Sequence, residues 1–219
     1  MNKASRNGRT RAGQGDARAP GVVRIIAGRW RGTRLPVPDV EGLRPTTDRV
    51  RETLFNWLQP VLPGAQVLDL FAGSGALGLE ALSRGADGAV LVERDRTLAG
   101  SLVATLERLP GGEAGRVVNA DAVAWLARQP VASWDIAFVD PPFAADLWQP
   151  ALGALLPRMR ADAWLYLESP VGAAHPLPTD WHLHRESRSR DVRHALYRRV
   201  ARPADTLPPD VAGAVPAGG

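Results

Sequence analysis

Two short segments of the chain combine residue types that suit chemistry between a nucleoside cofactor and a planar amine. The first, VLDLFAGSG at residues 67–75, places a carboxylate before a glycine-rich turn that can approach a ligand closely. The second, Asp140-Pro141-Pro142-Phe143, offers a carboxylate, exposed carbonyls and an aromatic ring. Each segment ends an apolar run that is typical of a buried strand. Together they predict a methyl-transfer site.

The second segment carries the chemistry. Two prolines restrict the backbone and lack an N–H, so this loop presents hydrogen-bond acceptors without a competing donor. An amine held between the Asp140 carboxylate and the Pro141 carbonyl directs its lone pair toward a methyl group, mainly in the transition state. Phe143 can stack on a flipped base. We therefore predict Asp140, Pro141, Pro142 and Phe143 as catalytic residues, with an ordinary turn as the alternative.

The glycine turn alone is ambiguous. Gly73, Gly75 and Gly78 match G-x-G-x-x-G, and Glu93 lies twenty residues beyond Gly73, which is also the fingerprint of dinucleotide-binding proteins. Asp69 favours a different cofactor, because its carboxylate would repel a pyrophosphate but suit an ammonium and a sulfonium. S-adenosylmethionine is such a cofactor. The remaining alternative is a glycine turn that only lets a strand and a helix pack.

Asp121 adds a third acidic position. It lies between a predicted strand and a predicted helix, where it can cap the helix, accept a hydrogen bond from an adenine amino group, or do both. The predicted cofactor-binding residues are Asp69, Phe71, Gly73, Gly75, Glu93 and Asp121.

Arginines are concentrated in the first part of the chain. The net charge of the whole chain is +4, yet residues 61–219 carry fifteen basic and eighteen acidic side chains, so the excess lies before residue 61. This asymmetry favours a polyanionic partner, and a solubilising basic tail is the alternative. Guanidinium groups pair well with phosphate. The predicted RNA-binding residues, expected beside the site, are Arg24, Arg29, Arg31, Arg34, Arg49 and Arg51, while Trp30 is a candidate anchor for the hairpin.

Strands and helices alternate from residue 66 onward, which predicts a mainly parallel sheet covered on both faces. The expected strands are 66–71, 88–93, 116–119, 134–139 and 163–168, and the expected helices are 76–84, 96–108, 121–128 and 147–159. Extended runs at 181–186 and 193–199 predict an antiparallel pair at one edge. Further short strands at 22–27 and 33–37 predict a hairpin.

A helix is expected to begin near residues 45–48, with a hydroxyl cap and an acid in its first turn. Its apolar side chains, Val50, Leu54, Trp57 and Leu58, are spaced to face the core. We expect Arg49, Arg51 and Glu52 to point away from that core.

Composition excludes several classes of site. The chain of 219 residues has no cysteine, and its four histidines lack metal-ligand spacing, so we expect no metal. No apolar run is long enough to span a bilayer, which predicts a soluble, cytoplasmic protein. Because no histidine or cysteine lies near Asp140 in the sequence, we expect no general base that titrates near neutrality.

The motif residues resemble those of a known family. The segments LDLFAGSG at 68–75 and DPPF at 140–143 are similar to S-adenosylmethionine-dependent amino-methyltransferases. The segments RIIAGRWRG at 24–32 and LRPTTDRVRETLFNWL at 43–58, with ALGLEA at 76–81, resemble the bacterial RsmD-type family. The resemblance spans about residues 22–200.

This resemblance implies an α/β protein with a Rossmann-like class I methyltransferase fold, in which a mainly parallel seven-stranded sheet has an antiparallel edge hairpin. It implies S-adenosyl-L-methionine as cofactor and the N2 amine of guanine 966 in 16S rRNA of the small ribosomal subunit as acceptor. We expect a monomer. The predicted parts are a disordered basic tail at 1–20, an RNA-binding hairpin and helix at 21–60, the methyltransferase domain at 61–200 and a disordered tail at 201–219.

Other functions stay open at this point. An amino-methyltransferase acting on adenine N6 in DNA or RNA, or on a protein glutamine, would share a similar loop. A nicotinamide-dependent oxidoreductase would keep the glycine turn and leave residues 140–143 without a role. An RNA-binding structural protein would account for the arginines alone.

Overall fold

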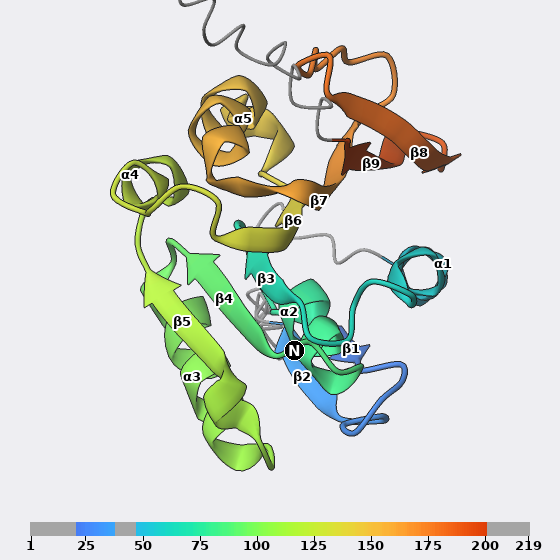
Figure 1. Ribbon diagram of the computed structural model, residues 1–219. Helices are drawn as coiled ribbons and strands as arrows, with labels where there is room; N and C mark the ends of the chain where they lie inside the picture. The colour runs from blue at the N-terminus through green and yellow to red at the C-terminus, as the bar shows by residue number, and fades with distance from the viewer. Residues whose placement is uncertain (1–20, 38–46, 201–219) are drawn as a thin grey trace, which may run out of the picture.

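The computed structural model describes residues 21–37 and 47–200, which form a twisted main sheet between two layers of helices and a separate two-stranded hairpin (Figure 1). The predicted tails at 1–20 and 201–219, and part of the 43–58 motif, lie outside the described residues. The strands are β1 (Gly21–Arg24), β2 (Arg34–Val37), β3 (Gln66–Asp69), β4 (Gly88–Glu93), β5 (Gly115–Asn119), β6 (Trp134–Val139), β7 (Met159–Pro170), β8 (Trp181–Arg188) and β9 (Val192–Arg199). The helices are α1 (Asp48–Leu58), α2 (Ala76–Ser83), α3 (Arg96–Arg108), α4 (Ala122–Leu126) and α5 (Trp148–Leu155).

Seven strands form the main sheet in the order β5-β4-β3-β6-β7-β9-β8. Strands β3 to β7 pair in parallel, and β9 pairs antiparallel with both β7 and β8. The predicted fold class and the antiparallel edge pair are therefore confirmed. The chain reverses its direction of winding between β3 and β6, and the carboxyl ends of strands at such a point are where open α/β sheets bind ligands.

Two hydrophobic clusters cover the two faces of this sheet. One contains side chains of α1, α2 and α3 with Val67 and Phe138, and the other contains side chains of α4 and α5 with Leu68 and Val139. Because successive strand residues point to opposite faces, neighbouring residues of β3 and of β6 fall into different clusters. Asp69 consequently projects toward α2, on the face of Val67.

Helix and strand ends follow local chemistry. Thr47 caps α1 as predicted, since its hydroxyl accepts a hydrogen bond from the N–H of Val50 at 3.4 Å. The helix predicted at 147–159 ends earlier, at Leu155, and continues as one 3-10 turn that contains Pro157. Proline cannot donate to the helical ladder. Strand β7 therefore begins at Met159 and is longer than expected.

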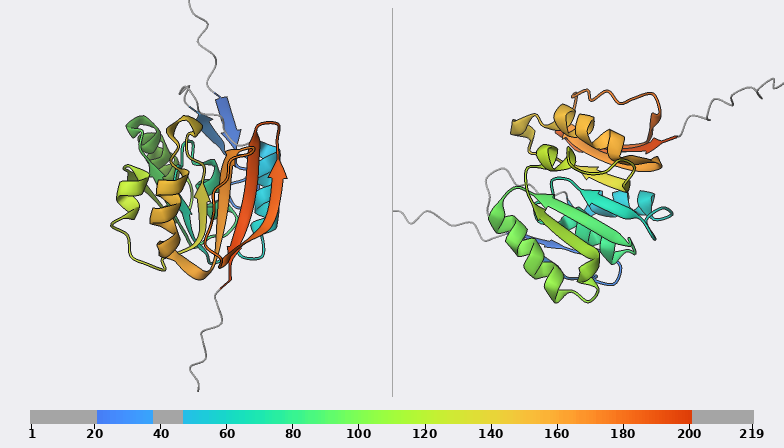
Figure 2. Two further views of the ribbon diagram at one scale, coloured as in Figure 1. Left: turned by 90° about the horizontal axis from the view of Figure 1, so that it is seen from above. Right: turned by 60° about the vertical axis from the view of Figure 1, so that its left-hand side comes forward.

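The hairpin of β1 and β2 packs on the helical layer and not on the sheet. Backbone N–H groups of Ile26 and Ala27 donate to the buried Glu80 carboxylate of α2 at 2.7 and 3.0 Å. In Figure 2, left, β1 and β2 reach the edge of the sheet toward which the β6 arrow points. Within the described residues no helix has the length and apolar character needed to cross a bilayer.

Candidate active site

The turn between β3 and α2 depends on glycine. Gly73 and Gly75 have φ values of 52° and 76°, in the left-handed region that side chains rarely adopt. A Cβ added to Gly75 would also lie 2.4 Å from the Leu102 side chain of α3. The turn can therefore form only if these positions are small. It leaves the start of α2 facing the carboxyl edge of the sheet.

Asp69 lies buried beneath this turn, where its carboxylate accepts a hydrogen bond from the N–H of Gly78 at 2.9 Å. The pKa of Asp69 is raised to about 7, mainly by burial and also by the charge of Glu93, against the opposing effect of the hydrogen bond from Gly78. A buried carboxylate with one neutral partner is an incompletely compensated anion. The position favours a cationic ligand.

Glu93, at the end of β4, holds the other side of the turn. Its carboxylate accepts hydrogen bonds from the N–H groups of Gly73 at 2.8 Å and Asp95 at 2.7 Å. Gly73 and Glu93, twenty residues apart in the sequence, are therefore in direct contact. Each carboxylate oxygen keeps a free lone pair for a ligand hydroxyl.

Asp121 and Phe71 occupy the margins of this region. Asp121 caps α4, accepting from the N–H of Ala124 at 3.0 Å, so its predicted capping role is confirmed. It is exposed, which leaves room for a ligand contact. Phe71 is half-buried and packs against the core cluster of α4 and α5.

Asp140 follows β6 at the same edge and is partly exposed. Within the described part of the chain its carboxylate receives no hydrogen bond. Pro141 is buried and Pro142 exposed. The Phe143 ring is 40% exposed and lies 5.5 Å from the Trp148 ring, so one of its faces is available for stacking.

The electrostatics of Asp140 differ from our expectation. Burial raises its pKa well above the usual value, and the negative charges of Glu168 and Asp69 raise it further. The prediction that no general base near this motif titrates near neutrality stays a prediction, and a carboxyl whose pKa is raised by burial is a candidate base that a search for histidine and cysteine overlooks.

Three further side chains belong to the group around Asp140, and none of them was predicted from the sequence: Glu168, Tyr166 and His194. They lie on β7 and β9, next to the strand that carries Asp140. The signal that could have found Glu168 is its place at the end of a predicted strand, which it shares with Glu93.

The structure contradicts the prediction that Arg51 points away from the core. It is fully buried, and its guanidinium donates to the Arg24 carbonyl at 2.8 Å and to the Asp48 carboxylate at 2.7 Å, and lies 3.7 Å from the Glu80 carboxylate. The buried face of α1 is formed by Arg51, Leu54, Phe55 and Leu58. A guanidinium enclosed in this way is not available for phosphate, so we withdraw Arg51 from the RNA-binding set.

The loop between β1 and β2 also lies elsewhere than predicted. The N–H of Arg29 donates to the carbonyl of Ser83, the last residue of α2, and its guanidinium donates to the carbonyl of Gly111, shortly before β5. Both contacts are at the edge where the strands begin, opposite Asp140. The expectation that Arg29 and Arg31 lie beside the site is therefore wrong.

Trp30 explains this placement. It is buried, and its indole N–H donates to the carbonyl of Pro110 at 2.9 Å, while its backbone N–H donates to the Ser83 hydroxyl at 2.9 Å. The alternative that Trp30 anchors the hairpin to the body is confirmed.

Arg24 and Arg34 form the strand pair of the hairpin that is nearest to the loop between β1 and β2. They are direct cross-strand partners, and both are exposed. Like charges directly opposite one another destabilise a strand pair, and no ion pair to either guanidinium occurs among the described residues. Helix α1, with the exposed Arg49 in its first turn, begins close by because Arg51 contacts the Arg24 backbone.

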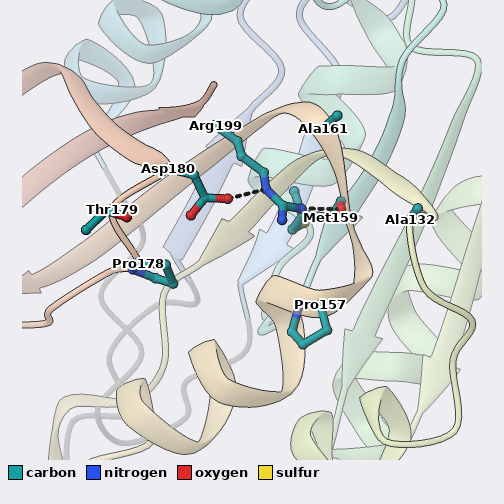
Figure 3. Close-up of a pocket in the computed structure, with 8 residues that line it drawn as sticks. All are labelled: Ala132, Pro157, Met159, Ala161, Pro178, Thr179, Asp180 and Arg199. Atoms are coloured by element: carbon teal, nitrogen blue, oxygen red, sulfur yellow. Dashed lines mark hydrogen bonds and ion pairs between the residues drawn. The ribbon is translucent and has the colours of Figure 1, made fainter. Parts of the chain in front are cut away.

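A surface pocket of about 650 Å³ lies far from these residues, at the edge where β7 begins (Figure 3). The Arg199 guanidinium points into it, donating to the Asp180 carboxylate and the Met159 carbonyl at 2.8 Å each. Its charged groups are thus paired with one another. The pocket lies where Arg199 of β9 contacts the start of β7. It is separate from the edge of the sheet that carries Asp69, Glu93 and Asp140.

The strand order, the glycine turn and the acidic residues at the carboxyl ends of β3, β4 and β6 define a class I methyltransferase fold. Comparison with known proteins agrees with that class. The model of the family described as Conserved hypothetical protein 95, the RsmD family, matches residues 23–198, and the chain belongs to this family of methyltransferases.

Named relatives fit the same family. The chain is 52% identical over 184 residues to Ribosomal RNA small subunit methyltransferase D of Escherichia coli K12, covering 83% of this chain and 92% of the relative. Its identity to the protein of the same name from Haemophilus influenzae is 42%, covering 82% and 95%. The solved structure of Escherichia coli yhhF superimposes with a TM-score of 0.75 at 48% identity, covering 83% of this chain and all of that one.

Proposed function

We propose that this methyltransferase transfers a methyl group from S-adenosyl-L-methionine to the N2 amine of guanine 966 in 16S rRNA, as a cytoplasmic monomer acting on the small ribosomal subunit. The names of its relatives favour small-subunit RNA as the substrate. The observation that carries the proposal is the Asp140 carboxylate, which accepts no hydrogen bond from residues 21–37 and 47–200 and is followed in the same loop by the exposed Phe143.

The donor set at the glycine turn suits the proposed cofactor. Among the described residues no cationic side chain pairs with buried Asp69, and S-adenosylmethionine carries an ammonium and a sulfonium. The carboxylate of Glu93 has acceptor capacity left for two ribose hydroxyls, and Asp121 can accept from an adenine amino group. When bound, this cofactor supplies an electrophilic methyl group. No cluster of three metal-ligating side chains occurs within residues 21–37 and 47–200.

The acceptor amine fits the second half of the site. Asp140 and the carbonyl of Pro141 hold its two hydrogens, so the nitrogen lone pair points away from the base plane. The conjugated amine is a poor nucleophile, and this restraint acts mainly in the transition state, where positive charge develops on nitrogen. Phe143 supplies the stacking surface for the base.

Transfer of labelled methyl groups tests this function. Purified protein is incubated with labelled S-adenosylmethionine and with small ribosomal subunits, total RNA, DNA or protein, and the products are digested to nucleosides and amino acids. We expect label in N2-methylguanosine at one position of 16S rRNA. Label in N6-methyladenine or methylglutamine would replace the proposal by one of the alternatives left open above. Comparable binding of a nicotinamide dinucleotide would contradict the cofactor assignment.

We also propose that Arg24, Arg34 and Arg49 contact RNA phosphates. The double variant Arg24→Gln, Arg34→Gln should weaken small-subunit binding about tenfold at physiological salt, and should lower the slope of log affinity against log salt by about 1.5, because each phosphate contact contributes roughly 0.7–0.9. Cofactor affinity should stay unchanged. The measurement is a filter-binding titration at several salt concentrations.

Arg31→Gln is the matched control, because Arg31 is exposed in the loop of the same hairpin, which Trp30 anchors to Pro110 at the edge where the strands begin. We expect its salt slope to equal that of the unmodified protein. If the control loses affinity and the double variant does not, the RNA surface extends over the opposite edge of the sheet.

A further inference from the structure

Asp140, Glu168 and His194 lie side by side across three neighbouring strands. Strands β6 and β7 pair Phe138 with Tyr166 and Val139 with Leu167, so the next pair in the same register is Asp140 with Glu168. Strands β7 and β9 pair Glu168 directly with His194. Side chains of residues paired in register point to the same face of a sheet. The three side chains therefore form one row at the carboxyl edge.

Tyr166 contacts two members of this row, Glu168 and His194. Its hydroxyl donates to the Glu168 carboxylate at 3.0 Å and lies 3.0 Å from Nδ1 of His194. The same Nδ1 is 3.4 Å from the Glu168 carboxylate. Tyr166 is fully buried, with its ring packed against Phe138 and parallel to His194. The carboxylate of Glu168 is thus fixed by two partners on two strands.

This network faces Asp140 and is not required by the fold. A buried carboxylate costs free energy unless it is compensated, and Glu168 is 7% exposed beside two further acids, Asp140 and Asp69. Burial, and after it the charges of Glu168 and Asp140, raise the pKa of Tyr166 well above its usual value, which places all three groups in one electrostatic unit. An apolar residue at position 168 would avoid this repulsion.

We propose that Glu168, held by Tyr166 and His194, is a positioning residue that keeps Asp140 basic enough to accept the proton lost by the methylated amine. This inference rests on the proposed function. As the nitrogen lone pair forms the new N–C bond, the S–C bond breaks and its electron pair stays on sulfur. The cationic nitrogen then releases one proton to the Asp140 carboxylate, its N–H electron pair returning to nitrogen. Asp140 passes the proton to solvent after the RNA leaves.

The charged and titratable groups around Asp140 are compatible with this role. Asp69 faces it from β3, Glu168 and Tyr166 from β7, and His194 lies beside Glu168 on β9. On the helices, the buried guanidinium among the described residues is that of Arg51 of α1, which pairs with Asp48 and lies 3.7 Å from Glu80. Negative neighbours thus dominate, and removal of one of them must lower the pKa of Asp140.

The pH profile of single-turnover methylation tests this inference. For the unmodified protein with saturating cofactor and small subunits, we expect a rate that rises with pH to a plateau. Glu168→Gln removes one negative charge without a change in size, so the inflection should move down by about one pH unit. The plateau should fall about tenfold, because Asp140 becomes a weaker base. Tyr166→Phe should move the inflection in the same direction, since the Glu168 carboxylate loses the hydroxyl that holds it beside Asp140.

Asp162→Asn is the matched control, an acid-to-amide change at an exposed position near the other end of β7, and it should leave the profile unchanged. An unchanged inflection in both Glu168→Gln and Tyr166→Phe would overturn the inference while the proposed function stands. If the unmodified protein forms no methylated guanine amine, the proposed function itself has failed.

Discussion

Replacement of Asp140 by alanine should lower the single-turnover rate of methyl transfer by about two to three powers of ten, the usual effect of losing one preorganised electrostatic partner. The carboxylate lies at the end of β6 with no hydrogen bond from the described residues, so its charge is available to the acceptor amine. Asp140→Asn should give an intermediate rate, because the amide keeps one acceptor oxygen and loses the charge. Cofactor binding should persist in both variants.

Single-turnover rates with saturating small subunits at neutral pH measure this effect separately from product release. Asp146→Asn is a suitable control, because it removes a nearby exposed carboxylate at a position where φ is 45°, which asparagine tolerates. A rate for Asp140→Ala equal to that of the unmodified protein would remove Asp140 from the mechanism.

Local signals predicted the order of elements and many of their limits. Helix α3 was predicted at 96–108 and is observed at Arg96–Arg108, because Asp95 caps it and accepts from the N–H groups of Thr97 and Leu98. The glycine turn and Glu93 were found for a similar reason, since a turn that requires positive φ has a strong local signature. What is decided within a few residues could be predicted from the sequence.

Interactions between residues that are far apart in the sequence could not be predicted in this way. The role of Glu168 depends on the register of β6 with β7 and of β7 with β9, which no local pattern specifies. The place of the loop around Arg29 depends on the bond from Trp30 to Pro110, eighty residues away. Hydrophobic periodicity treats arginine as a surface residue, and it therefore failed for Arg51, whose partner Glu80 lies on another helix.

That buried pair has a large expected effect on stability. Glu80 is fully buried and accepts from the backbone N–H groups of Ile26 and Ala27 and from the Arg84 guanidinium, while the Arg51 guanidinium lies 3.7 Å away. It therefore joins the hairpin, α1 and α2 through one carboxylate. Removal of one partner from a buried ion pair leaves an uncompensated charge and costs about 3–5 kcal/mol.

We accordingly expect Glu80→Ala to lower the free energy of unfolding by about 3–5 kcal/mol, measured by urea denaturation with tryptophan fluorescence. Glu52→Ala, at an exposed position on α1, is the control and should change it by less than about 0.5 kcal/mol. The double variant Arg51→Met, Glu80→Ala should lower the free energy of unfolding by less than the sum of the two single changes, because neither charge is then left without the other. A Glu80→Ala variant within about 1 kcal/mol of the unmodified protein would show that the hairpin and α1 are held by apolar packing around Trp30 and Leu54 rather than by this carboxylate.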